Sequence, residues 1–155
     1  MLVKKKSQKQ ERQVAREIYG KTVPASGAFP TFKGDVRSNF YLVECKTTEK
    51  DFYVLHYKVW QKIYNEALKD GLREPLMQVD LKDGKERYAV LSERTFGEYF
   101  DVTKLDKVDI RSKTFRIKKS VYINWLNLMP LIVVEWDTFI NDIAPLYEQD
   151  LLGGN

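Results

Sequence analysis

Cysteine and histidine are almost absent from this chain of 155 residues, which contains one of each, Cys45 and His56. A single cysteine excludes an internal disulfide, and one histidine excludes any site that needs a histidine pair or a Cys/His cluster. Long hydrophobic runs are absent as well, because the longest, "LMPLIVV" at 128–134, is far shorter than the roughly 20 residues of a membrane helix. We therefore expect a cytoplasmic protein without a membrane partner.

The residues that are present are typical of a globular protein, with 43% hydrophobic and 31% charged residues. The length fits a single domain over residues 1–155, with a basic leader (1–7) and a tail (151–155) that we expect to be flexible. Lysine and arginine exceed the acidic residues by 26 to 22, which gives a net charge of +4. That excess is compatible with a polyanionic partner but does not require one.

Hydrophobic periodicity predicts two amphipathic helices. The first covers residues 8–19 and carries Val14 and Ile18 on its apolar face. The second covers residues 54–70, has apolar side chains at helical spacing, and ends at Gly71. These two helices enclose the segment in which the polar residues of interest occur.

Strand patterns fill much of the remaining chain. A short polar turn separates a strand that begins at Asp35 from a largely apolar strand at 40–46, which indicates an antiparallel hairpin. Two further strands flank the turn dipeptide Asp83-Gly84. The last third of the chain reads as strand, short helix, strand and helix.

Ionisable side chains interrupt the otherwise apolar strand at 40–46. Because residues i and i+2 share a face of a strand, Glu44 and Lys46 are neighbours, and Cys45 points to the other face. Antiparallel pairing across the short turn brings Asp35 near the level of Glu44. Two carboxylates and an ammonium group then meet in one patch, and hard oxygen ligands of this kind suit Mg²⁺.

Glu11 adds a third carboxylate from the first helix. Positions 11, 14, 15 and 18 lie on one helical face, so Glu11 shares the apolar side, whereas Glu17 falls off it. A carboxylate that points toward a sheet is costly unless it is paired or bound to a metal. Glu11 is therefore the candidate ligand of the two.

The order of these features resembles the PD-(D/E)xK nuclease superfamily: an amphipathic helix, a hairpin that begins with aspartate, Glu-x-Lys on a largely apolar strand, and a second amphipathic helix. It is most similar to the archaeal type of Holliday-junction resolvase and its phage relatives, over roughly residues 8–95. The residue before the aspartate is Gly34, where the family motif has proline, and the chain from about residue 104 has no counterpart that we can place.

The resemblance implies a restriction-endonuclease-like α/β fold, with a central mixed β-sheet flanked by α-helices, and a Mg²⁺-dependent endodeoxyribonuclease for which Mn²⁺ is a substitute ion. By resemblance, the metal site falls on Glu11, Asp35 and Glu44, with Lys46 near the nucleophile and Ser26 as a catalytic serine on the loop after the first helix. Whether one or two ions bind stays open. The expected substrate is a four-way DNA junction, which has approximate two-fold symmetry, so a homodimer is expected to make paired symmetric nicks.

Basic residues near this site are the expected contacts to DNA phosphates, which set affinity and salt dependence without reading the bases. A second basic stretch, residues 104–119, holds seven basic residues against two acidic ones, and either phosphate contact or a solvated surface explains it. The expected nucleic-acid-binding residues are Lys4, Lys5, Lys6, Lys9, Arg12, Lys33 and Arg37.

Three alternative interpretations stay open. The first is a nuclease of the same superfamily that acts on flaps, duplex ends or linear duplex. The second is a non-catalytic DNA-binding or packaging protein that retains the fold, because Glu-x-Lys after an aspartate also arises by chance and a strand-edge ion pair has little energetic weight. The third is a protein-interaction domain without a nucleic acid partner.

Overall fold

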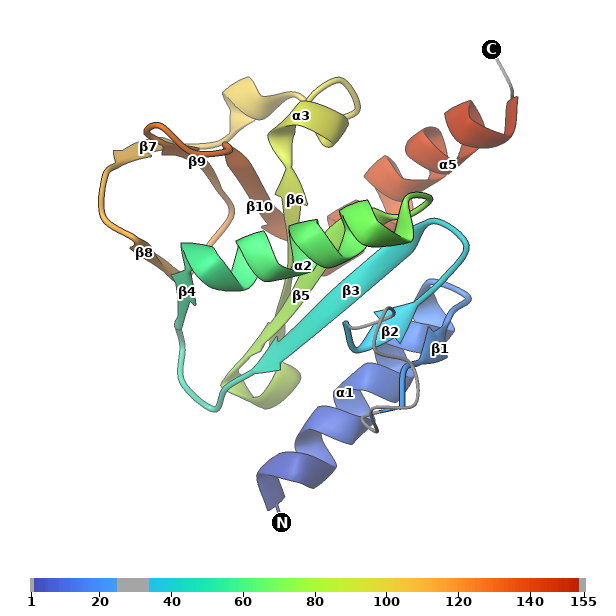
Figure 1. Cartoon of the computed structure of the whole chain (residues 1–155). Coiled ribbons are helices and arrows are strands. Elements are labelled where there is room, and N and C mark those ends of the chain that lie inside the picture. The colour runs from blue at the N-terminus through green and yellow to red at the C-terminus, as the bar shows by residue number, and fades with distance from the viewer. Residues whose placement is uncertain (1, 25–33, 154–155) are drawn as a thin grey trace.

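The computed structural model describes residues 2–24 and 34–153, and these build a mixed eight-stranded β-sheet with helices on both faces (Figure 1). The strand order is β1-β2-β3-β5-β6-β10-β9-β7, and neighbours are antiparallel except for the parallel pairs β3–β5 and β7–β9. The predicted α/β class with a central mixed sheet is confirmed; the restriction-endonuclease-like type stays a prediction. The strands are β1 (Lys21–Thr22), β2 (Val36–Arg37), β3 (Tyr41–Thr47), β5 (Glu74–Leu81), β6 (Glu86–Ser92), β7 (Lys107–Ile110), β9 (Val121–Trp125) and β10 (Leu131–Glu135).

Helices cover the two faces unequally. The N-terminal helix α1 and the C-terminal helices pack on one face, and α2 packs on the other (Figure 1). The C-terminal segment is continuous, because α4 leads through a π-helical turn directly into α5. The helical elements are α1 (Leu2–Glu17), α2 (Tyr57–Asp70), η1 (Lys82–Gly84), α3 (Glu93–Phe96), η2 (Val102–Lys104), α4 (Trp136–Thr138), η3 (Phe139–Ile143) and α5 (Ala144–Gly153).

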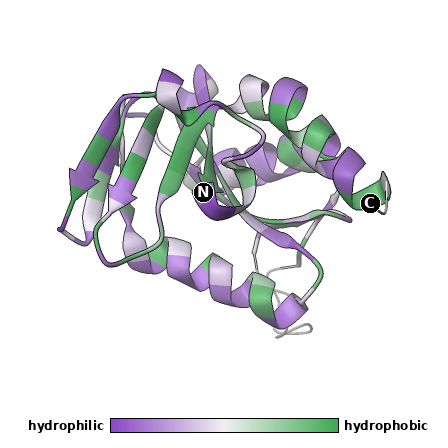
Figure 2. Ribbon diagram, turned by 90° about the horizontal axis from the view of Figure 1, so that it is seen from above, coloured by the Kyte–Doolittle hydropathy of each residue, from purple (hydrophilic) through white to green (hydrophobic). Residues whose placement is uncertain are grey.

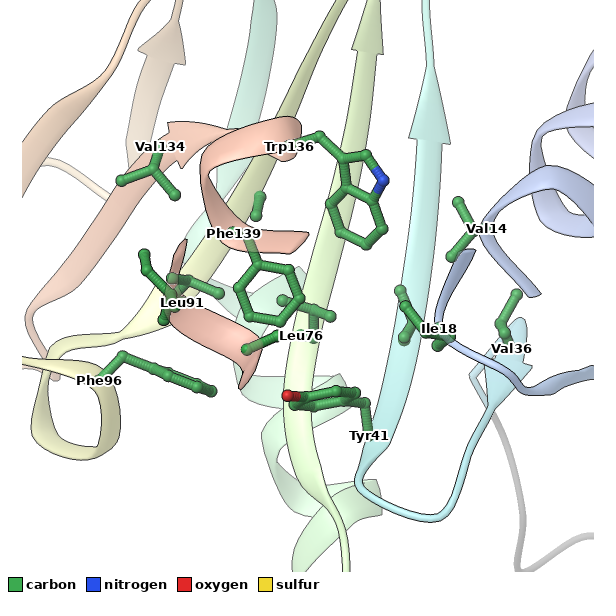
Figure 3. Packing of buried hydrophobic residues seen from close by; sticks show 14 of the residues in the cluster. Val14, Ile18, Val36, Tyr41, Leu76, Leu91, Phe96, Val134, Trp136 and Phe139 are labelled. Atoms are coloured by element: carbon green, nitrogen blue, oxygen red, sulfur yellow. The ribbon is translucent and has the colours of Figure 1, made fainter. Parts of the chain in front are cut away.

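A hydrophobic cluster fills the space on each side of the sheet. On the α1 side, Val14 and Ile18 pack toward the sheet near Val36, and Trp136 and Phe139 of the C-terminal segment extend the same cluster (Figure 3). On the α2 side, the cluster includes Trp60, Ile63 and Trp125. The central strands β5, β6 and β10 are therefore buried on both faces, and along each helix hydrophobic and hydrophilic residues alternate (Figure 2).

A two-stranded ribbon lies beside the main sheet. Strand β4 (Tyr53–His56) pairs antiparallel with β8 (Thr114–Ile117), and Leu55 and Ile117 bury their side chains in the α2-side cluster. This ribbon was not predicted. The prediction that a helix starts at residue 54 is wrong, because α2 begins three residues later, at Tyr57.

Other boundaries also differ from the predictions. α1 begins at Leu2, so residues 2–7 of the basic leader are helical, which agrees with the high helix propensity of lysine and glutamine. α5 continues to Gly153, through most of the predicted tail. The last third of the chain was predicted as strand, short helix, strand and helix, but it contains four strands before the C-terminal helices, among them β9, which pairs with both β7 and β10. Pairing with distant strands thus overrides the local pattern.

Several predicted features are confirmed. β2 and β3 form an antiparallel hairpin, and β5 and β6 form another around Asp83-Gly84, where both residues have positive φ. α2 ends at Gly71, whose φ of 79° is left-handed and whose N–H donates to Ala67 O.

No helix in the described ranges combines the length and the hydropathy that crossing a bilayer requires.

Gly20 connects α1 to β1 at a point where another strand passes very close. A Cβ atom on Gly20 would lie 2.5 Å from the carbonyl oxygen of Arg37 in β2. We predict that Gly20→Ala lowers the free energy of unfolding by about 1 to 3 kcal/mol, the range for an overpacked site, when measured by urea denaturation. Gly153→Ala is the control, because a Cβ there meets nothing within 4 Å. Equal stability of the two variants would contradict the close approach.

Candidate active site

Strand β3 pairs with β2 only in its first, apolar half, and its second half, which carries Glu44 and Lys46, has no strand beside it on that edge within the described residues. β2 pairs with β3 only as far as Val43, so the edge of β3 from Glu44 onward faces no strand within the described ranges. Asp35 extends the pairing instead: its backbone N–H donates to Val43 O at 2.7 Å, and its Oδ2 accepts the Cys45 N–H at 2.7 Å. This charge-assisted bond fixes the carboxylate beside the strand. The predicted position of Asp35, level with Val43 and Glu44, is confirmed.

Glu44 and Lys46 lie on the same face of β3, as predicted. Leu42, two residues before Glu44, packs in the α2-side cluster, whereas Val43 packs on the α1 side. Glu44 is buried, and its Oε2 lies 3.3 Å from Lys46 Nζ. Burial and the negative charge of Asp35 raise the pKa of Glu44, and the charge of Lys46 partly offsets that rise.

Glu11 approaches the same edge from α1, which packs on the opposite face of the sheet from α2. Partial burial, followed by the charge of Asp35 and a hydrogen bond to its carboxyl group, raises the pKa of Glu11 to about 7. The charge of Glu44 adds to this rise, and Arg12 counteracts it. The three carboxyl groups predicted from the sequence therefore lie close enough to repel one another.

These carboxyl groups have the chemistry of a Mg²⁺ site. Among the residues that the structure describes, no three His, Cys, Asp or Glu side chains are already arranged to enclose a metal ion. Glu11 is hydrogen-bonded to Asp35, and Glu44 is paired with Lys46. A divalent cation prefers carboxylate oxygens and supplies the positive charge that would replace a proton between two carboxyl groups. Carboxylate oxygens are suitable ligands for Mg²⁺, and a site on Glu11, Asp35 and Glu44 stays a prediction.

Two further side chains border Glu44 and were not predicted. The charge of Lys62, on α2, lowers the pKa of Glu44, and its Nζ also lies 3.5 Å from Glu66 Oε1. Burial and the nearby charge of Glu44 raise the pKa of Tyr53, at the start of β4, to about 12. Lys62 and Glu66 are four residues apart on a helix, a spacing that is typical of ordinary surface ion pairs, so the sequence carries no signal that Lys62 lies near Glu44.

The remaining predicted residues are placed as follows. Ser26 and Lys33 lie outside the described residues. Lys6 pairs with Asp83 at 3.0 Å, and Arg37 pairs at 3.2 Å with Asp70, whose side chain is 1% exposed. These two cations are thus partly neutralised within the protein. The predicted contacts on α1 that are exposed are Lys4, Lys5, Lys9 and Arg12.

A buried polar network fixes α1 against the sheet next to Glu11. Gln10 Nε2 donates to Lys46 O at 2.8 Å and to Gln78 Oε1 at 2.7 Å. Gln78 Nε2 in turn donates to Asp80 Oδ1 at 2.6 Å. Gln78 and Asp80 alternate with apolar residues on β5, the same i, i+2 signal that revealed Glu44 and Lys46, and this signal was overlooked in the sequence.

The network continues to the other end of α1. Arg87 on β6 donates to Asp80 Oδ1 at 3.2 Å and forms a bidentate pair with Glu17, both distances 2.8 Å. Glu17 Oε1 also accepts the Trp136 indole N–H at 3.2 Å. The prediction that Glu17 points away from the packed side of α1 is wrong: it is partly buried and anchors the helix. Two anchors, Gln10 and Glu17, therefore set the position from which Glu11 reaches Asp35.

The pKa of Glu11 is higher in the folded protein than in the unfolded chain, so the free energy of unfolding depends on pH. The folded protein holds a proton on Glu11 up to about pH 7, whereas the unfolded chain releases it near the ordinary value of 4.5. Stability therefore falls as pH rises from about 4.5 to 7, by only about 1 kcal/mol because solvent screens a half-exposed group. We predict that a carboxyl NMR titration of the metal-free protein gives a Glu11 midpoint near 7 and that Asp35→Asn lowers it. A midpoint near 4.5 in the unmodified protein would disprove the close approach of the two carboxyl groups.

Removing the guanidinium of Arg87 leaves two carboxylates, those of Asp80 and Glu17, without their cation in a site that is mostly shielded from solvent. We predict that Arg87→Met lowers the free energy of unfolding by about 2 to 4 kcal/mol in urea denaturation. The matched control is Lys6→Met, which breaks the exposed pair with Asp83 and is expected to cost about 0 to 1 kcal/mol. Similar losses in both variants would show that the network does not anchor α1.

Comparison of the chain with protein-family models, with curated proteins and with solved structures finds no match. The function is therefore inferred from the residues of the site, their geometry and the resemblance in residue order described above.

Proposed function

We propose that this protein is a Mg²⁺-dependent DNA endonuclease of the PD-(D/E)xK type. The observation that carries the proposal is the convergence of Glu11, Asp35 and Glu44 from three separate elements, with Lys46 next to Glu44. The succession of α1, the β2–β3 hairpin, α2 and β5 supports a restriction-endonuclease-like fold. An ordinary surface ion pair would not bring a carboxylate from a distant helix to the same strand edge.

The site residues have distinct roles in the proposed reaction. Glu11, Asp35 and Glu44 would hold the ion. Bound Mg²⁺ acts as a Lewis acid that polarises the phosphoryl oxygen, lowers the pKa of bound water and stabilises the leaving oxygen. Lys46, 36% exposed, is placed to orient the attacking water or to offset the charge that develops on the phosphate. Lys62 provides a second positive charge on the α2 side of Glu44.

The substrate we propose is branched DNA, with a four-way junction as the first choice. One chain contributes one site, and a junction must be cut on two strands related by approximate two-fold symmetry, so the active form would be a homodimer with C2 symmetry. Exposed apolar side chains on α5 support a self-association surface in the C-terminal part of the chain. These are Leu146, Leu151 and Leu152.

Cleavage of a labelled four-way junction tests this function. We expect paired nicks that require Mg²⁺, or Mn²⁺ in its place, and a loss of at least about 100-fold in rate for Glu44→Gln and for Asp35→Asn, the scale of losing one charge-stabilising group. The control is Glu135→Gln, because Glu135 is exposed at the end of β10, a strand separated from β3 by β5 and β6.

The comparison of substrates separates the junction resolvase from related enzymes. A flap and a linear duplex are incubated beside the junction, and faster cleavage of either one would replace the resolvase with another structure-specific nuclease. Absence of cleavage with every divalent metal, in a protein that still binds DNA, would leave a DNA-binding protein without catalysis. Unchanged cleavage by Glu44→Gln would disprove the proposed site.

A further inference from the structure

The outer face of the β4–β8 ribbon is a cluster of positive charge that the proposed catalytic site does not use. Residues 111–120, which include β8, contain five basic residues and no acidic residue. Of these five, only Lys119 forms an ion pair within the described part of the chain, with Asp106 at 2.8 Å. The other four are exposed, and they are Arg111, Lys113, Arg116 and Lys118.

Strand alternation separates the two faces of the ribbon. Leu55 and Ile117 point inward and are fully buried in the α2-side cluster, so Val54 and its cross-strand partner Arg116 point outward. Lys118 continues the outward face of β8 by the same alternation. Arg116 and Lys118 therefore lie on one side of the ribbon, and Lys113 is exposed immediately before β8, so these three positive charges are close in the chain and repel one another unless an anion is present.

The ribbon is held rigidly, so these charges are in place before any partner binds. Trp125 Nε1 donates to Ser112 O at 2.6 Å, and Tyr57 N–H donates to Lys113 O at 2.8 Å. The guanidinium carbon of Arg116 lies 4.2 Å from the centre of the Phe52 ring, a stacking contact that restricts the side chain. Arginine held in this way keeps N–H groups free to bind phosphate oxygens.

The position of the ribbon connects it to the candidate active site. Tyr53, the first residue of β4, lies near enough to Glu44 for that carboxylate to raise its pKa. The loop that leads from β3 to β4 is tied to the β5–β6 turn, because Lys82 N–H donates to Lys50 O at 2.9 Å and Asp83 N–H donates to Thr48 O at 3.0 Å. The ribbon is thus a fixed neighbour of the strand that carries Glu44 and Lys46.

The chemistry of the outer face favours a phosphate backbone over a protein or a lipid surface. None of the large hydrophobic side chains that are exposed in the described residues lies on the ribbon. A protein partner needs a buried aromatic or aliphatic anchor, and a membrane partner needs apolar side chains to insert. DNA phosphates need only cations that are fixed and unpaired.

We propose that Lys113, Arg116 and Lys118 on the ribbon contact the phosphate backbone of a duplex arm of the DNA bound at the candidate active site. This inference rests on the proposed DNA substrate, but not on its cleavage. It assigns the basic stretch at 104–119 in part to binding, and it places a second DNA contact on the opposite side of β3 from α1.

The test compares two triple variants that each remove three positive charges. The ribbon variant is Lys113→Gln/Arg116→Gln/Lys118→Gln, and the control variant is Lys69→Gln/Arg94→Gln/Lys104→Gln. The control residues are exposed, form no ion pair within the described ranges, and lie on α2, α3 and the turn η2. Binding of a four-way junction and of a linear duplex is followed by fluorescence anisotropy over a series of salt concentrations, with Ca²⁺ in place of Mg²⁺ to prevent cleavage.

We expect the ribbon variant to bind both DNAs more weakly, with a plot of log affinity against log salt that is shallower by about two to three units, at about 0.9 per lost contact. The control variant should keep the slope of the unmodified protein. The single variant Arg116→Gln should lower the slope by about one unit.

The outcomes distinguish this inference from the proposed function. If the ribbon and control variants have the same slope, the ribbon inference fails even when the protein cleaves DNA. If the unmodified protein binds DNA without cleaving it, the nuclease proposal fails and the slopes still decide the role of the ribbon. A protein that binds no DNA at any salt concentration would overturn both.

Discussion

Mutual repulsion among Glu11, Asp35 and Glu44 is the constraint that the surrounding structure must satisfy. The three carboxyl groups come from a helix, from the residue before a short strand, and from the strand beside it. The charge of Asp35 raises the pKa of both Glu11 and Glu44, and the charge of Glu44 raises the pKa of Glu11. The fold counters this repulsion with a proton on Glu11 and with the positive charges of Arg12, Lys46 and Lys62. Such an arrangement weakens the folded state near neutral pH. Perturbed pKa values of this kind are common at functional sites.

Other parts of the fold hold these groups together against that repulsion. The short strand β2 begins only at Val36, opposite Val43, which leaves the edge of β3 open from Glu44 onward, and the Asp35 carboxylate occupies that edge through the Cys45 N–H. The polar network through Gln10, Gln78, Asp80, Arg87 and Glu17 fixes α1 at both ends of its packed face. The hydrogen bonds of this buried network restrict how α1 sits on the sheet, although Gln10 Oε1 has no partner within the described residues, so the position of Glu11 depends on contacts that do not involve Glu11 itself.

Much of the site could be predicted from the sequence because its signals are local. Alternation along one strand placed Glu44 and Lys46 together, a short turn set the level of Asp35, and helical periodicity chose Glu11 over Glu17. The reason given for rejecting Glu17 was nevertheless wrong, because helical spacing reports the packed side of a helix but not a partner such as Arg87 at its margin.

The features that were missed depend on pairing between distant segments. The ribbon joins residues 53–56 to residues 114–117, and no local pattern reports that pairing, so Val54 and Leu55 were assigned to the helix that follows them. Lys62 faces Glu44 only because α2 packs across β3 and β5, whose parallel pairing is likewise long-range. The ribbon also brings the basic strand β8 beside β4, whose first residue, Tyr53, lies near Glu44.

The most direct test of the central claim is where a divalent ion binds. Mn²⁺ at low concentration broadens the NMR signals of nearby groups, so a titration of the labelled protein reads out the site without DNA and without activity. The account predicts early loss of the amide signals of Glu11, Asp35, Glu44 and Cys45, while those of Asp80, Asp83 and Arg87 persist. Broadening that begins at Asp80 and Asp83, or that spreads evenly over the acidic surface, would contradict a metal site at the open edge of β3.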